Sequence, residues 1–273
     1  MAAITSNHLV ISNFNTDPSA LIRYTDSFTL YDQSTDLKIR DAVLGAHPQA
    51  VLSTNCGHSL ANFFNFVAEN HEDLPEVVAF LKGNIIGRHV TENFFKTRIA
   101  NSVYTPLFDD PNFTPSTGVA SLLTDGLILE INNSWYIDRS RDRYLSSYND
   151  VLRFLYQDPV FPEFVAFAPG GCYIVPREML KRVPSALWSA LAWLTSYDFM
   201  PPEAYLVERV MHTLFTSSND FQPWCYSESA FRNQLSQRRG GQSPKSRPVD
   251  TARRAWRSVK MARTYYRHYS FVE

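Results

Sequence analysis

The sequence predicts an α/β fold with a mixed, Rossmann-like sheet that is flanked by helices and followed by a basic C-terminal tail. Short β-prone runs alternate with amphipathic helical stretches along most of the chain. Hydrophobic residues make up 44% of 273 residues, enough to bury the core of one α/β domain with an appendage or of two small domains. No internal repeat is present.

The N-terminal third predicts a strand–helix–strand unit. Residues 8–13 are apolar and β-prone, and Asp17-Pro18 has the residue types that open a helix. Residues 27–32 form a second strand that ends in an acid. This opening resembles the nucleotide-binding half of a doubly wound sheet, although no glycine-rich phosphate loop is present.

The periodicity of apolar residues and the turn residues predict the elements that follow. A helix at 59–70 places four apolar residues on one face, whereas 101–126 is rich in proline and predicts loops. Later helices open at Arg177-Glu178 and run from Glu203 to about Phe215. The other predicted strands are 75–81, 126–131, 164–168 and 172–175.

The net charge of −1 conceals an asymmetric charge distribution. Residues 233–273 carry ten of the 26 Lys and Arg residues but two of the 27 acids, so this segment is +8 and the remainder is −9. Ser, Gln, Arg, Gly and Pro dominate 236–250. We therefore expect a domain at 1–235, a flexible linker at 236–250 and a basic amphipathic helix at 251–273.

The predicted tail helix has the composition of a membrane-surface helix. Its apolar face carries Trp and Tyr, and its polar face is basic, which suits an anionic membrane surface. An alternative is that the tail docks on the acidic domain, and this alternative stays open. The candidate membrane-binding residues are Arg253, Arg254, Trp256, Arg257, Lys260 and Arg263.

Three scattered cysteines, with no signal peptide and no run long enough to span a bilayer, predict free thiols in a reducing compartment. The cysteines lack the spacing of zinc ligands, so zinc binding is not expected. We therefore expect a cytoplasmic protein, peripheral to the inner face of the cell membrane. Because the excess positive charge is confined to the tail, nucleic acid is not an expected partner.

Polar residues that follow the predicted strands form the candidate donor site. Open α/β sheets bind ligands at the carboxyl ends of their strands, although each such residue alone is also a common turn or cap residue. Basic residues among them could stabilise a diphosphate leaving group. The candidates are Asn13, Asn15, Asp32, Asn55, His58, Lys82, Asn84, Arg88 and His89.

Two glutamates in the predicted helix at 203–215 are the candidate catalytic residues. Glu203 follows Pro201-Pro202 on the first turn, a position that we expect to expose its carboxylate. A purely structural role is the alternative, since a glutamate at the N-terminus of a helix interacts favourably with the helix dipole. Glu208 lies further along, and with Arg209 it could form a structural ion pair. The candidate acceptor-binding residues are Asn132, Asn133, Trp135, Gly170, Gly171 and Arg177.

The order of elements in the C-terminal half resembles the acceptor half of GT-A glycosyltransferases. This order is strand, Gly-Gly, strand, Arg-Glu, helix, and then Pro-x-Glu at the start of another helix. It is similar to metal-independent branching N-acetylglucosaminyltransferases, whose catalytic base opens such a helix; the matching residue is Glu203. The segments 80–89, 130–136 and 167–178 resemble bacterial polysaccharide-locus proteins. These are related to galactofuranosyltransferases of O-antigen galactan synthesis and to DUF3431-type proteins. The resemblance covers about residues 8–216.

The resemblance implies an inverting transfer of a sugar, galactofuranose being one candidate, from a UDP-sugar to a glycan or lipid-linked glycan. No other cofactor is expected. Lys82-Gly83-Asn84 stands where many relatives carry the metal-binding Asp-x-Asp, and Asp109-Asp110 is interpreted as a loop feature, so no divalent metal is expected. Two alternatives stay open: a glycoside hydrolase that pairs Glu203 with Glu130 or Glu178, and a non-enzymatic protein with a basic tail that binds nucleic acid or membrane.

Overall fold

The computed structural model describes residues 4–110, 112–113, 122–137 and 143–238. Its centre is a mixed six-stranded sheet with the strand order β3-β2-β1-β4-β9-β5. The first four strands in this order are parallel, whereas β9 pairs with β4 and β5 in antiparallel fashion. The strands are β1 (His8–Asn13), β2 (Phe28–Asp32), β3 (Val51–Leu52), β4 (Val77–Lys82), β5 (Thr105–Pro106) and β9 (Tyr173–Pro176).

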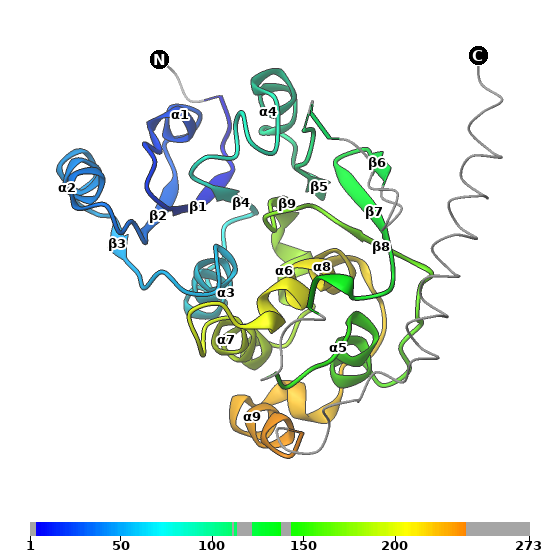
Figure 1. Cartoon of the computed structure of the whole chain (residues 1–273). Helices are drawn as coiled ribbons and strands as arrows, with labels where there is room; N and C mark the ends of the chain where they lie inside the picture. Colours follow the sequence, from blue (N-terminus) through cyan, green and yellow to red (C-terminus); the bar gives the residue numbers. More distant parts are fainter. Residues whose placement is uncertain (1–3, 111, 114–121, 138–142, 239–273) are drawn as a thin grey trace, which may run out of the picture.

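Helices cover both faces of this sheet (Figure 1). Alternation along the strands decides which side chain enters which core: Val10 and Phe80 enter the larger core, whereas Leu9 and Leu81 enter the smaller one. The smaller core is completed by α1 (Ser19–Ile22), α2 (Leu37–Ala46) and α4 (Glu92–Arg98). The larger is completed by α3 (Leu60–Glu69), α5 (Tyr148–Leu155), α7 (Ser185–Leu194), α8 (Pro202–Thr216) and α9 (Glu228–Ser236).

A second, three-stranded antiparallel sheet has the order β6-β7-β8 and packs on α8. It consists of β6 (Leu122–Thr124), β7 (Leu127–Ile131) and β8 (Phe164–Phe167). Both carboxylate oxygens of Glu130 in β7 accept hydrogen bonds from Arg209 of α8, from Nε at 2.7 Å and from Nη2 at 3.2 Å. Both side chains are buried, so this bidentate ion pair joins the small sheet to the rest of the domain.

The predicted fold class is confirmed at the level of an α/β protein with a six-stranded, largely parallel mixed sheet flanked by helices. The predicted strands and the helices at 59–70 and 203–215 all form, with ends that shift by one or two residues. The sequence analysis did not identify α2, α4, α5, α7 and α9 as helices. Four of these five begin with a side-chain cap, supplied by Asp36, Thr91, Ser147 and Ser227.

The described chain continues just beyond the predicted start of the linker at 236. Ser236 is the last residue of α9, and Arg238 pairs with Asp150 of α5 at 2.8 Å and lies over the ring of Phe154. The remainder of the predicted linker and the membrane-binding residues 253–263 lie outside the described residues. No helix in the described part of the chain is long and apolar enough to cross a membrane.

We predict that Glu130→Ala lowers the free energy of unfolding by about 3–5 kcal/mol, because it leaves Arg209 buried without its partner. Urea denaturation followed by circular dichroism measures this change. The double variant Glu130→Leu/Arg209→Met should recover most of the loss, since it buries no charge. Glu163→Ala, at an exposed glutamate near the same sheet, is the control and should change stability by less than about 0.5 kcal/mol. A similar small loss in Glu130→Ala would contradict the prediction.

Candidate functional site

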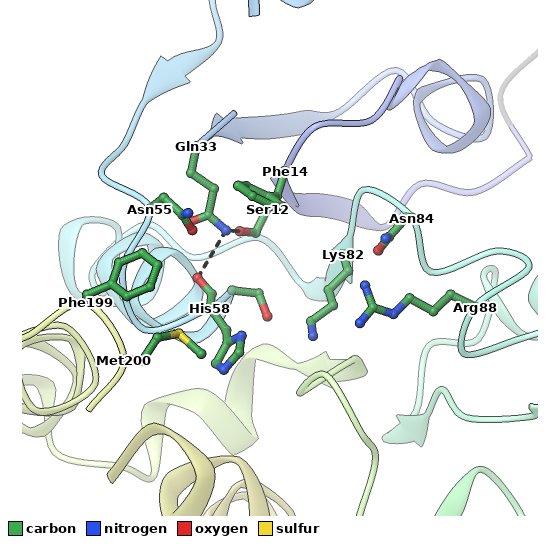
Figure 2. A pocket seen from close by; sticks show the side chains of 11 residues that line it. Ser12, Phe14, Gln33, Asn55, His58, Lys82, Asn84, Arg88, Phe199 and Met200 are labelled. Atoms are coloured by element: carbon green, nitrogen blue, oxygen red, sulfur yellow. Dashed lines mark hydrogen bonds between the residues drawn. The ribbon is translucent and has the colours of Figure 1, made fainter. Parts of the chain in front are cut away.

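A pocket of about 280 Å³ opens where the strand order reverses, at the carboxyl ends of β1 and β4. The chain continues from β1 to β2 and β3 on one side, whereas β4 lies on the other, so the connecting loops diverge here and leave a crevice. Figure 2 shows the side chains that line it. They are Ser12, Phe14, Gln33, Asn55, His58, Ser59, Lys82, Asn84, Arg88, Phe199 and Met200.

Polar contacts behind the pocket hold the ends of β1 and β2 together. The Asn13 amide donates to the Asp32 carboxylate at 2.9 Å, and the Thr16 hydroxyl donates to the Asn13 carbonyl oxygen at 2.6 Å. Asn15 accepts from the backbone N–H groups of residues 35 and 36. Asn13, Asn15 and Asp32, which the sequence analysis placed among the donor-binding residues, therefore shape the loops and do not line the pocket.

Positive charge gathers at one end of the pocket, where Lys82 and Arg88 lie side by side in Figure 2. Among the described residues, neither side chain has an ion pair or a side-chain hydrogen bond. No carboxylate lines the described pocket. Two basic groups that lack an acidic partner in a concave site favour an anionic ligand.

Two histidines next to these cations are neutral at pH 7. Burial, followed by the charges of Lys82 and Arg88, lowers the pKa of His89 to about 4. Burial and Lys82 also lower the pKa of His58, against a smaller opposite effect of Glu208. The Nε2 atoms of both rings are buried without a hydrogen-bond partner among the described residues. The positive charge of the site at neutral pH therefore comes from Lys82 and Arg88.

An amide and a hydroxyl form a polar wall at the other end. The Gln33 side-chain N–H donates to the His58 carbonyl oxygen at 3.2 Å and lies 3.3 Å from the Ser12 hydroxyl oxygen. Ser12 accepts a second bond from Asn62, so its own proton is free to point elsewhere. The Gln33 side-chain oxygen is buried and has no partner in the described chain. The wall therefore offers the Ser12 hydroxyl as a donor to a ligand.

Apolar side chains border the same end. Phe14, Phe199 and Met200 are 42%, 65% and 38% exposed. Phe199 and Met200 lie on the side of the pocket opposite Arg88, and Phe14 lies between them and Arg88, beside Ser12 (Figure 2). The loop before α3 packs tightly against the end of α7: a Cβ on Gly57, whose φ is +64°, would lie 1.9 Å from the Thr195 carbonyl oxygen. This close approach requires glycine.

Helix α8 brings a carboxylate close to the cationic end, although Glu208 itself does not line the pocket. Glu208 accepts a hydrogen bond from the Gly170 N–H at 2.7 Å, and its other oxygen lies 3.5 Å from Arg209. A Cβ on Gly170, with φ of +87°, would lie 3.1 Å from the Lys82 side chain. One turn earlier, Tyr205 packs edge-on against the His58 ring. Glu208 is 20% exposed and stands across Gly170 from Lys82.

The expectation that Glu203 exposes its carboxylate is wrong. Glu203 is 0% exposed. Its side chain accepts hydrogen bonds from the backbone N–H groups of Tyr144 and Leu145 and from the Tyr197 hydroxyl. The turn that precedes α5 folds over the start of α8, and its N–H groups bind the Glu203 carboxylate. Glu203 therefore holds this turn in place.

The predicted acceptor residues divide into two groups. Gly170 and Gly171 form a turn with positive φ values; Gly170 lies next to Lys82, beside the pocket, whereas Gly171 lies against Leu60 and Met211. Arg177 pairs with Glu76. Because β9 runs antiparallel to β4, the carboxyl end of β9 lies beside the amino end of β4, away from the pocket.

The residues after β7 belong to the small sheet. Asn132 donates to Asn149 and to the Pro162 carbonyl oxygen, and Asn133 accepts from the backbone N–H of Trp135. Trp135 is 47% exposed. None of these three lines the pocket.

Sequence reasoning found five of the residues that line the pocket: Asn55, His58, Lys82, Asn84 and Arg88. It missed Ser12, Phe14, Gln33, Ser59, Phe199 and Met200. A signal existed for Phe14 and Gln33, since each directly follows a predicted strand. Phe199 and Met200 come from a loop more than a hundred residues away in the chain, and no local pattern indicates that they reach the pocket.

The described residues contain no group of three or more His, Cys, Asp or Glu side chains that could hold a metal ion. Asp109 accepts from the Thr91 hydroxyl, and Asp110 accepts from the Asn112 N–H. A scan of family models found no match to the chain, and searches of curated proteins and of solved structures gave no significant match.

We predict that inorganic pyrophosphate binds the pocket and raises the thermal unfolding midpoint, because a ligand of the folded state adds about 2.7 kcal/mol at a hundred times its dissociation constant. Lys82→Ala and Arg88→Ala should each weaken binding by roughly ten- to a hundred-fold, the scale of a charged hydrogen bond. Lys38→Ala, at an exposed lysine of α2, is the matched control. Equal binding by all three variants would rule out this anion site.

Proposed function

We propose that this protein is an inverting glycosyltransferase with a nucleotide-sugar donor. The observation that carries the proposal is the division of the pocket into two ends at the switch point of the sheet. One end has two cations without acidic partners, and the other has exposed aromatic rings beside a polar wall. A nucleoside diphosphate has the matching division between charged phosphates and a planar base.

The donor is placed with its diphosphate at Lys82 and Arg88 and its base between Phe14 and Phe199. The Ser12 hydroxyl supplies a donor to the edge of the base or to the ribose. The neutral His58 lines the pocket without a further charge. UDP is the nucleotide that the family resemblance implies.

Glu208 is the general base in this proposal. It takes the proton from an acceptor hydroxyl while that oxygen forms a bond to the anomeric carbon of the donor sugar. The bond between the anomeric carbon and the phosphate oxygen breaks on the opposite side, and the diphosphate leaves with its electron pair. Lys82 and Arg88 stabilise the negative charge that develops there. Glu203 was the first candidate for this role, but its carboxylate is consumed by buried hydrogen bonds.

The geometry disfavours a glycoside hydrolase. That reaction requires two carboxylates that face one scissile bond. Glu203 is fully buried, and both oxygens of Glu130 are held by Nε and Nη2 of Arg209. Glu178 is exposed on α6 (Arg177–Lys181), which follows β9 at the edge of the sheet opposite the pocket.

The proposed donor sugar, acceptor and cellular location also rest on the sequence. The mixed sheet agrees with a GT-A-like fold, and the resemblance to polysaccharide-locus enzymes suggests galactofuranose and a glycan or lipid-linked acceptor. A cytoplasmic position at the inner face of a membrane would bring the enzyme to a lipid-linked acceptor. The binding of residues 253–263 to anionic membranes is expected from the sequence. These residues lie outside the described part of the chain, and the docking of the tail that we propose below is the competing alternative.

We predict that Glu208→Gln reduces turnover by roughly two to four decades, the scale of a general base, and leaves donor affinity nearly unchanged. A thermal-shift screen of nucleotide sugars first identifies the donor, and product formation then measures turnover. Glu203→Gln is the matched control on the same helix and should retain turnover per folded molecule within about ten-fold. The reverse outcome, in which Glu203→Gln is inactive and Glu208→Gln is active, would refute the assignment of the base.

We predict that turnover survives EDTA after metal stripping, because Lys82 and Arg88 supply the positive charge that a metal would provide. Residual metal is measured by elemental analysis of the same samples. Complete loss of turnover that Mn²⁺ or Mg²⁺ restores would contradict this prediction and direct attention to Asp109 and Asp110.

A further inference from the structure

The outer face of the small sheet is entirely apolar where the structure describes its side chains. In the register of β7 and β8, Leu129 lies opposite Ala166, and Ile131 lies opposite Phe164. Side chains that are opposite each other in an antiparallel pair point to the same face. The alternate residues, Glu130 and Val165 among them, face α8 instead.

Apolar sheet faces are normally covered by a second layer. Helix α8 provides this layer on the inner face, and no other described helix makes a comparable contact with β7 or β8. Phe164 is 40% exposed, and the segment before it adds Val160 and Phe161, which are 76% and 41% exposed. The outer face of β7 and β8, together with Val160 and Phe161, is called the outer apolar surface below.

Negative charge borders the outer apolar surface. Asp158 and Glu163 are exposed on either side of Val160 and Phe161 in the sequence. The guanidinium of Arg153, on α5, lies 4.4 Å from the centre of the Phe161 ring and links this surface to α5. Acidic groups around an apolar surface favour a partner that is both apolar and basic.

The described chain ends beside this surface. Arg238 is fixed to α5 by its ion pair with Asp150 and by its contact with the Phe154 ring. Asp150 and Arg153 lie on the same helix, so the chain leaves α5 close to the residue that touches Phe161. The twelve residues 239–250 can span up to roughly 40 Å when extended, which is ample for this distance.

We propose that residues 251–269 form an amphipathic helix that docks on the outer apolar surface. The sequence places Ala255, Trp256, Val259, Ala262 and Tyr266 on one helix face, which would cover Leu129, Phe164 and Ala166. Ile131 of the same sheet face is already buried, at 6% exposure. The Arg and Lys residues at its margin would lie near Asp158 and Glu163. An intramolecular helix has the advantage of a high effective concentration. The proposal concerns the tail and does not depend on the proposed enzymatic function.

The test is a disulfide between the two surfaces in the full-length chain. Ala166→Cys/Val259→Cys, oxidised at low protein concentration, should form an intramolecular disulfide about ten-fold faster than a non-docked pair, as expected from a raised effective concentration. Ala42→Cys/Val259→Cys is the matched control, since Ala42 is exposed on α2 at the other side of the molecule. Peptide mapping by mass spectrometry identifies the disulfide. Equal rates for the two pairs would overturn the proposal.

Hydrogen exchange of the unmodified chain gives a second measurement that needs no cysteine. Amides of 251–269 should be protected without any membrane, and Asp158→Lys/Glu163→Lys should reduce this protection, as should high salt. If protection arises only when phosphatidylserine vesicles are added, the tail is a membrane-surface helix and the docking proposal is wrong. Unprotected amides under both conditions would also overturn it.

Discussion

The ion pair between Arg209 and Glu130 is the contact on which the arrangement of this protein depends. The guanidinium lies over the rings of Tyr136 and Phe167, at 3.5 and 4.4 Å from their centres, and its Nε and Nη2 atoms donate to Glu130. A buried charge without such partners would be costly. The pair therefore fixes α8 against the small sheet, and it also fixes the neighbouring Glu208.

Two glutamates of α8 differ in role because their environments differ. Glu203 is buried at the first turn, where it accepts two hydrogen bonds from the turn before α5 and a third from the Tyr197 hydroxyl. Glu208 lies five residues further, on the side that meets Gly170 and the cationic end of the pocket. Two carboxylates on one helix are thus assigned opposite roles, one structural and one proposed to be chemical, by what surrounds them.

The electrostatics of the pocket follow from the absence of lining carboxylates in the described chain. Lys82 and Arg88 are not neutralised, and the burial and the charges around them keep His89 and His58 uncharged at neutral pH. Fixed positive charge in a concave, partly desolvated site stabilises a phosphate leaving group without reorganisation of the protein. This is the physical basis of the proposal that no metal ion is required.

The sequence by itself determined the α/β class, the strands and the cluster of polar residues after β4, because alternation and turn residues are local properties. The capped helices α2, α4, α5 and α9 were also within reach of sequence reasoning, since each begins with Asp, Thr or Ser. Only the tertiary structure decided which glutamate of α8 is buried and that Arg177 lies away from the pocket. It also decided that Phe199 meets Asn55 and His58 across the pocket. These facts depend on the direction of β9 and on contacts between segments distant in the chain, and neither leaves a local pattern in the sequence.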